Sequence, residues 1–204
     1  MPQKTKLLTQ RPIHYTPDTH IKKRNLVFVD LEFSGLEPKH EMIQIGCVVV
    51  SQPDLKILKE WSQRIKPSRI RNADPNALKI IGYSKEKWRD AVPLKQALTE
   101  FNEVAKGGVL IGYNVAWDFL FLKKAYAEAT MKPLFHWQVL DVLSMLFHDL
   151  YRTKMNGFRM KEVVDFFHMR DDQWHDALVD ARATYVIFKK LIQYNHTHRK
   201  KKHI

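Results

Sequence analysis

The sequence predicts an α/β domain in which helices pack on a mixed sheet. Apolar, β-branched runs of strand length occupy residues 26–65, and a helical period dominates from Asp74 onward. One more short apolar run, at 109–111, lies among the predicted helices. Strands followed by helices around a further strand are typical of a sheet with helices packed on it. The 204 residues suit one domain, and we find no internal repeat and no low-complexity linker.

Three strands are predicted in the first third of the chain, at 26–31, 42–50 and 55–65. The second is an apolar, β-branched run, so we expect it to be central and covered on both faces. Pro67 ends the third strand, because proline cannot continue the hydrogen-bonded ladder. The run at 109–111 predicts a short buried strand.

Helix signals follow these strands. The pair Asp74–Pro75 combines a capping residue with proline in the first turn, which is a strong helix start. The last predicted helix has an acid in its first turn, which the helix dipole favours. The further helices are expected from 93 to about 107, then at 114–129, 138–150, 159–168 and 176–194.

Positive charge is concentrated at the two ends. The net charge is +12, and residues 189–204 hold six Lys or Arg and no acid. Flexible basic ends attract a phosphate polymer by releasing its counterions. Other readings of the run 199–202 are a solubilising tail or, more weakly, a nuclear address. We therefore divide the chain into a basic irregular N-terminal arm, a folded domain and a basic C-terminal tail, at 1–24, 25–194 and 195–204.

Composition excludes several classes of protein. The single cysteine, Cys47, rules out an intramolecular disulfide and a cysteine-rich zinc site, and its apolar neighbours predict a buried core thiol. No apolar run is long enough to span a membrane, and the N-terminus has no signal-peptide core, so we expect no membrane partner. The cytoplasm is the expected compartment, with the nucleus as the alternative in a eukaryote.

Two acids lie within the first strand. Asp30 and Glu32 follow the apolar run 26–29, and alternation along a strand points both to one face, roughly 6.7 Å apart. Carboxylates side by side on a buried strand are costly unless a cation lies between them. Mg²⁺ and Mn²⁺ are the usual cations for an all-oxygen site. Such a pair alone is more often two solvated surface acids; its apolar strand favours the metal reading.

Two later segments supply further candidates. Asp118 falls in the first turn of the helix that follows the strand at 109–111, where alone it would simply complement the helix dipole. His175 and Asp180 would lie about 140° apart within one helix. They can face one site if His175 lies in the loop before the helix and Asp180 one turn inside it. A histidine there could accept a proton from water near neutral pH.

Four acids suit a site for two divalent ions. Two Mg²⁺ or Mn²⁺ ions balance four carboxylates, and ions about 3.5–4 Å apart clamp the attacking and leaving oxygens of a phosphoryl transfer. This balance explains how the acids could be tolerated together. The predicted set is Asp30, Glu32, Asp118 and Asp180, with His175 as the base.

The ordered motifs resemble the DEDD exonucleases of the histidine type, the superfamily of the DNA polymerase III epsilon proofreading subunit, RNase T and oligoribonuclease. The resemblance spans about residues 25–192 and implies a ribonuclease H-like fold. The motifs are Asp30-x-Glu32, Asn114-x-x-x-Asp118 and His175-x4-Asp180, with weaker agreement at 65–67, 74–82 and 139–141.

The resemblance implies a metal-dependent 3′-to-5′ hydrolysis of DNA or RNA that releases nucleoside 5′-monophosphates. It assigns the four acids as metal ligands and His175 as the general base. The segment after the first motif would hold the 3′ end, with Ser34 on the 3′-hydroxyl, Leu36 against the terminal base and Phe33 stacked on a base or packed in the core. Asn114 is a fourth predicted substrate contact.

The sequence departs from the family pattern in the pocket wall. Many relatives have His-Asn before the third acid and Phe just ahead of it, whereas this chain has Tyr113–Asn114 and Trp117. The ligands are kept and the substrate preference stays open between DNA and RNA. The stretch 151–160 holds three cations and reads either as a substrate contact or as an ordinary solvated loop.

The expected partners are the 3′ ends of single-stranded DNA or RNA, and a DNA polymerase is a candidate in a proofreading role, with end trimming as the other role. Two alternatives stay open: a nucleic-acid-binding module of the same fold without catalysis, and, less favoured, a strand-transferring enzyme. The first is disfavoured because all five catalytic positions are present.

Overall fold

The computed structural model describes residues 20–153, 155–169 and 175–199. Most of the predicted N-terminal arm and the last five residues of the predicted tail lie outside these ranges. In the described part, no helix has the length and apolar character that crossing a membrane requires.

Five strands form one sheet in the order β3-β2-β1-β4-β5. β1 pairs antiparallel with β2, which pairs antiparallel with β3, whereas β4 and β5 run parallel to β1. The sheet is therefore mixed, as predicted. The strands are β1 (Leu26–Phe33), β2 (Met42–Val50), β3 (Ile57–Arg64), β4 (Val109–Gly112) and β5 (Val139–Asp141).

The predictions of a buried second strand and of a core thiol at Cys47 are confirmed, and the predicted start of the helix at 138 is wrong. β2 is buried along its whole length, and Cys47 is a core thiol whose pKa burial raises to about 12. The helix predicted at 138–150 begins late, because its first residues pair with β4 and form the edge strand β5. Asp141 then caps the helix, since its Oδ2 accepts a hydrogen bond from the Ser144 N–H at 3.1 Å.

The remaining helices lie close to their predicted positions. The Asp74 cap is present, with its Oδ1 accepting from the Asn76 N–H at 2.8 Å. The last helix continues five residues beyond Tyr194, where the Asn195 side chain hydrogen bonds to Asp149. The helices are α1 (Pro75–Ile80), α2 (Leu94–Ala105), α3 (Ala116–Glu128), α4 (Val142–Leu150), α5 (Met160–Phe166) and α6 (Ala177–Arg199), with short 3-10 turns at Ile21–Lys23 and Ile70–Asn72.

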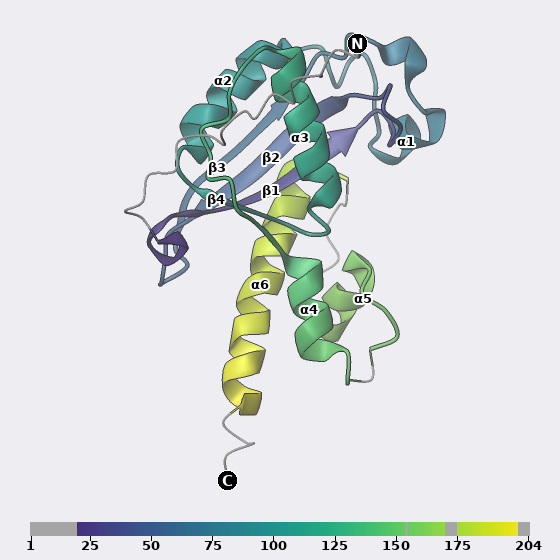
Figure 1. Ribbon diagram of the computed structural model, residues 1–204. Coiled ribbons are helices and arrows are strands. Elements are labelled where there is room, and N and C mark those ends of the chain that lie inside the picture. The colour runs from purple at the N-terminus through teal and green to yellow at the C-terminus, as the bar shows by residue number, and fades with distance from the viewer. Residues whose placement is uncertain (1–19, 154, 170–174, 200–204) are drawn as a thin grey trace, which may run out of the picture.

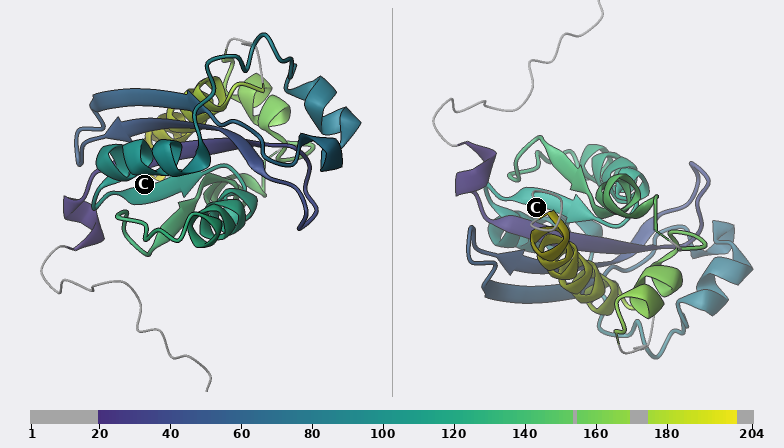
Figure 2. Two further views of the ribbon diagram at one scale, coloured as in Figure 1. Left: turned by 90° about the horizontal axis from the view of Figure 1, so that it is seen from above. Right: turned by 90° about the horizontal axis from the view of Figure 1, so that it is seen from below.

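The helices cover both faces of the sheet (Figures 1 and 2). Val27, Val29 and Leu31 of β1 pack in the core formed with α2 and α3. Leu26 and Phe28 point the other way, into the core formed with α4, α5 and α6. Because side chains alternate along a strand, Asp30 and Glu32 belong to the face that α6 covers.

Gly46 of β2 brings the start of α6 directly onto the sheet. Gly46 lies opposite Asp30 in the β1–β2 register. A Cβ on Gly46 would lie 2.3 Å from the backbone of Ala177 and of Leu178, so no larger side chain fits without displacing the helix. The first turn of α6 therefore lies beside Asp30, and the absence of a side chain at Gly46 is what permits it.

Candidate active site

The site forms where β1 extends past its parallel neighbour. β4 pairs with β1 only through Leu26–Phe28, so the rest of this edge of β1 is free of strand partners in the described structure. The turn after β4 places the start of α3 at this free edge. There the Leu31 N–H donates to Oδ1 of Asp118 at 3.0 Å. Asp118 thus lies against the same stretch of β1 that carries the two strand acids.

Asp118 is a buried acid, with 6% of its surface exposed. Burial raises the pKa of its carboxyl to about 7, against the effect of backbone hydrogen bonds, including that from Leu31, which lower it. The charge of Asp141 acts in the upward direction. A carboxyl in this setting keeps its negative charge at neutral pH only with difficulty unless a cation is close.

The strand acids are in a similar state. The pKa of Asp30 lies well above its ordinary value, first because of burial and then because of the charges of Asp118, Asp180 and Glu32 and of Asp176. Burial raises the pKa of Glu32 to about 8, with a contribution from Asp180, while Lys87 acts in the opposite direction. These acids therefore repel one another across a confined space.

His175 and Asp180 are held together at the start of α6. His175 lies just before the helix with a left-handed backbone, φ +69°, and Asp180 lies in the first turn. The His175 N–H donates to Oδ2 of Asp180 at 3.1 Å. This is the arrangement that the spacing requires if both side chains are to face one site. Ligand atoms of Glu32, His175 and Asp180 lie within 4.8 Å of one another.

The donor set fits a hard divalent cation. Oδ1 of Asp180 is buried, and no described residue hydrogen bonds to it. Burial also raises the pKa of this carboxyl, while the N–H and charge of His175 lower it. A buried acceptor without a donor, beside acids that repel each other, is the environment that a cation with oxygen ligands would satisfy.

Two further residues organise the site and were missed from the sequence. Asp176 caps α6, with Oδ1 accepting from the N–H groups of Leu178 at 3.1 Å and Val179 at 3.4 Å. Its Oδ2 accepts from Nε2 of Gln44 at 3.0 Å. The available signal was Gln44 itself, a polar residue within the apolar run Met42–Val50.

The predicted substrate-contact residues differ in their solvent exposure. The ring of Phe33 packs against Phe121 with centroids 4.3 Å apart, so it is partly a core residue. Leu36 is 54% exposed. Asn114 is exposed in a left-handed turn, φ +57°, a conformation that asparagine tolerates well.

Ser34 is buried and takes part in closing its own loop. Its hydroxyl accepts from the Glu41 N–H at 2.9 Å, and its N–H donates to the Glu41 carbonyl at 2.8 Å. The contact of Ser34 with a 3′-hydroxyl stays a prediction. His40 and Gly35 complete the loop, because a Cβ on Gly35 would lie 2.4 Å from the His40 ring.

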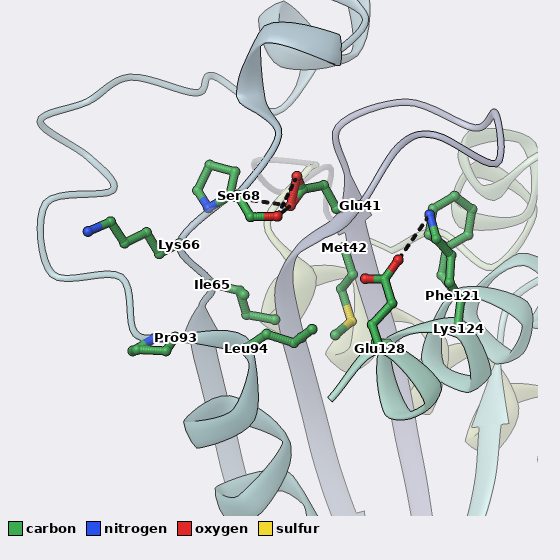
Figure 3. Close-up of a pocket in the computed structure, with 12 residues that line it drawn as sticks. Glu41, Met42, Ile65, Lys66, Ser68, Pro93, Leu94, Phe121, Lys124 and Glu128 are labelled. Carbon is green, nitrogen blue, oxygen red and sulfur yellow. Dashed lines mark hydrogen bonds and ion pairs between the residues drawn. The ribbon is translucent and has the colours of Figure 1, made fainter. Parts of the chain in front are cut away.

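A pocket of about 320 Å³ lies behind this loop, and none of the four acids lines it (Figure 3). Glu41 accepts from the N–H and hydroxyl of Ser68 at its rim, at 2.8 and 3.0 Å. Lys124 of α3 donates to two carbonyls of the loop, those of Pro38 and His40. Residues of the pocket wall therefore hold the segment that follows Glu32 in place by hydrogen bonds.

Curated proteins with similar sequences are much longer than this chain. The DNA polymerase III PolC-type of Thermotoga petrophila is 26% identical over 86% of this chain, and that of Caldanaerobacter subterraneus 29% over 82%. The 3′-5′ exonuclease DinG of Bacillus subtilis is 25% identical over 85%. The chain spans only 12%, 11% and 18% of these proteins.

Solved structures share the fold. Exonuclease I of E. coli, solved in a complex with single-stranded DNA, superposes with a TM-score of 0.71 at 19% identity, covering 87% of this chain and 43% of that one. The nuclease domain of 3′hExo, described as a DEDDh family member bound to rAMP, gives 0.70 at 16% identity, covering 84% and 92%. At these identities the likeness establishes the fold, and the predicted ribonuclease H-like arrangement is confirmed.

The family model described as Exonuclease matches residues 27–188. The match covers most of the chain and includes all three motifs, from Asp30 through Asp118 to Asp180. The predicted family is therefore confirmed, and the chain belongs to this exonuclease family.

Proposed function

We propose that this protein is a metal-dependent 3′-5′ exonuclease that trims single-stranded DNA or RNA to nucleoside 5′-monophosphates. The observation that carries the proposal is the convergence of four acids and His175 from β1, α3 and α6 at one end of the sheet. Family membership supports the reaction class. We propose residues 25–194 as the catalytic domain, with basic segments at both ends that attract the substrate.

Asp30, Glu32, Asp118 and Asp180 would hold two Mg²⁺ or Mn²⁺ ions. When bound, such ions polarise the scissile phosphate and the attacking water. The protein holds the acids in place before any ion arrives: Leu31 fixes Asp118, and His175 fixes one oxygen of Asp180. This preorganisation leaves Oδ1 of Asp180 available as a ligand.

His175 is the proposed general base. Its side chain is exposed beside the carboxylates, and the hydrogen bond from its N–H to Asp180 fixes its backbone. The imidazole would take the proton of the attacking water as the water's oxygen bonds to phosphorus. The bond from phosphorus to the 3′ oxygen of the preceding nucleotide would break, and that oxygen would take a proton from water to become the new 3′-hydroxyl. Leu36, exposed beyond Glu32, would press on the terminal base.

The other predicted substrate contacts are Phe33, Ser34 and Asn114. A DNA polymerase is the proposed protein partner, supported by the similarity to one segment of PolC-type polymerases.

The reaction is tested with 5′-labelled single-stranded DNA and RNA of one sequence in Mg²⁺, Mn²⁺ or EDTA. We expect a ladder that shortens from the 3′ end and is absent in EDTA. Binding without shortening would instead support a non-catalytic module, and nicking of a closed circle would support strand transfer.

Replacing Asp30 by Asn is expected to abolish turnover and stabilise the metal-free protein. The loss of activity should exceed about 100-fold, because Asp30 is one of the four proposed metal ligands. The burial of a charge and the repulsion that together raise the pKa of Asp30 are also removed, so Tm in EDTA should rise by roughly 2–4 °C per kcal/mol gained. Asp90→Asn, at an exposed acid paired with Arg89, is the matched control and should change neither. Full activity of Asp30→Asn would contradict the assignment.

Replacing His175 by Ala separates its role as a base from a role as a ligand. As a base, its loss should lower kcat by about 10²–10⁴-fold and leave the Mg²⁺ concentration for half-maximal activity unchanged. If His175 were a metal ligand, its loss would instead raise the Mg²⁺ concentration for half-maximal activity severalfold. Titrating Mg²⁺ in the label-shortening assay distinguishes the two, and a shifted Mg²⁺ requirement would overturn the base assignment.

The stability of the metal-free protein is expected to fall as pH rises from about 5 to 8. Folding raises the pKa of Glu32 to about 8 and that of Asp118 to about 7. At a pH between the ordinary pKa of each carboxyl and its raised pKa, the folded state therefore binds more protons than the unfolded state. Protons and divalent ions compete for the same oxygens, so Mg²⁺ should raise Tm more at pH 8 than at pH 6. Thermal unfolding in EDTA and in Mg²⁺ measures both; a Tm that rises with pH in EDTA would contradict the prediction.

A further inference from the structure

Helix α4 and the residue that caps its C-terminus carry two exposed aromatic rings side by side. Phe147 is 57% and Tyr151 51% exposed. Their centroids lie 5.7 Å apart and their planes are 23° apart, so the rings are stacked. We call this pair the α4 platform. It presents an open aromatic surface to solvent, unlike the aromatic side chains of the two cores.

The α4 platform is joined to the active-site turn by direct contacts. The ring of Phe158 meets Phe147 edge-on at 5.6 Å. The carbonyl of Phe158 accepts a hydrogen bond from the hydroxyl of Tyr113 at 2.5 Å. Tyr113 immediately precedes Asn114, in the turn that leads to Asp118. These contacts connect the platform to the turn that leads to Asp118.

The charge around the α4 platform suits a polyanion. The guanidinium of Arg152 lies 5.3 Å from the Tyr151 ring, and its Nε donates to the Tyr151 hydroxyl at 2.7 Å. Asp149 is a partly buried acid that His148 and Asn195 engage. The contact with Asn195 holds α6 against α4, as Figure 1 shows.

We propose that the α4 platform binds the single strand on the 5′ side of the 3′ end being removed. Bases stack on Phe147 and Tyr151 while phosphates face Arg152. Stacking on exposed rings is independent of base sequence and weakens with loss of the ring. This proposal rests on the proposed exonuclease function and extends it to nucleotides beyond the reaction centre.

The test compares three substrates in the double variant Phe147→Leu/Tyr151→Leu. Leucine keeps the packing against Phe158 but removes both rings. For a single strand of about 20 nucleotides, KM should rise roughly tenfold or more with kcat unchanged. A trinucleotide and the p-nitrophenyl ester of thymidine 5′-monophosphate are too short to reach the platform, so their hydrolysis should not change. An unchanged KM for the long strand would overturn the proposal, and so would an equal loss on the ester.

Two controls isolate stacking. Tyr151→Phe keeps the ring and loses only the hydroxyl that accepts from Arg152, so KM should rise far less than in the double variant. Leu58→Ser removes an exposed apolar side chain, 52% exposed, from the opposite edge of the sheet, and should not alter KM. If the parent protein hydrolyses no substrate, the function fails separately, and the platform is tested by fluorescence anisotropy of the labelled strand in EDTA. Weaker binding by the double variant supports the platform, and equal binding overturns it.

A second observation, independent of the first, concerns Gln44. Gln44 is 3% exposed, lies opposite Glu32, and donates through Nε2 to Asp176 at 3.0 Å and to the hydroxyl of Ser62 at 3.3 Å. Because Asp176 caps α6, we infer that Gln44 and Asp176 form a positioning pair that sets where α6 begins. The pair thereby sets where Asp180 meets the strand acids.

Exchanging the two groups tests the pair. Gln44→Glu replaces a donor by a carboxylate facing Asp176, and should raise the Mg²⁺ concentration for half-maximal activity about tenfold or more. Adding Asp176→Asn restores a donor to the pair while an oxygen still caps α6, and should return that concentration to within about threefold of the parent. Gln96→Glu, exposed on α2, is the charge control. No effect of Gln44→Glu, or no rescue in the double variant, would overturn the pair.

Discussion

Crowding of two buried and two half-buried carboxylates is the constraint on which the rest of this structure depends. Asp30, Glu32, Asp118 and Asp180 all have a raised pKa, and burial is the first cause in each case. Without a cation the cluster opposes folding, because a single buried charge is already costly and four compound the cost. The sheet must therefore supply enough apolar burial to hold the acids together before any ion binds.

The architecture supplies that burial on both faces of β1. Valines and leucines of one face pack against α2 and α3, and the other face packs against α6. β2 is buried throughout and lies beside β1 for the whole length of the acid-bearing segment. The acids occupy the end of a rigid strand, which fixes their positions more closely than a loop would. Gly46 then lets the last acid approach from α6.

How much could be predicted follows from how local each signal is. Alternation along β1 predicted that Asp30 and Glu32 share a face. Helix spacing allowed His175 and Asp180 to face one site only with His175 in the loop before the helix, and Asp118 was joined to them by the charge argument and the resemblance. β5 was missed because a three-residue strand has no period of its own and exists only through its pairing with β4. The pairing of Gln44 with Asp176 joins residues 132 positions apart, so no local sequence pattern could predict it. The hydroxyl of Ser34 is likewise engaged by a neighbour that the motif does not contain.

Helix α6 connects the acidic and the basic regions of this protein. Its first turn brings Asp180 to the carboxylate cluster, and its other end leads into the basic segment 189–204. At about 1.5 Å per residue, Lys189 and Lys190 lie roughly 14–15 Å along the helix from Asp180, and the helix ends roughly 28 Å from it. Both distances exceed the Debye length of about 8 Å at physiological salt, so screening weakens the effect of these cations on the acids. Screening of this kind is one reason why a site of concentrated negative charge can lie in a chain with a net charge of +12.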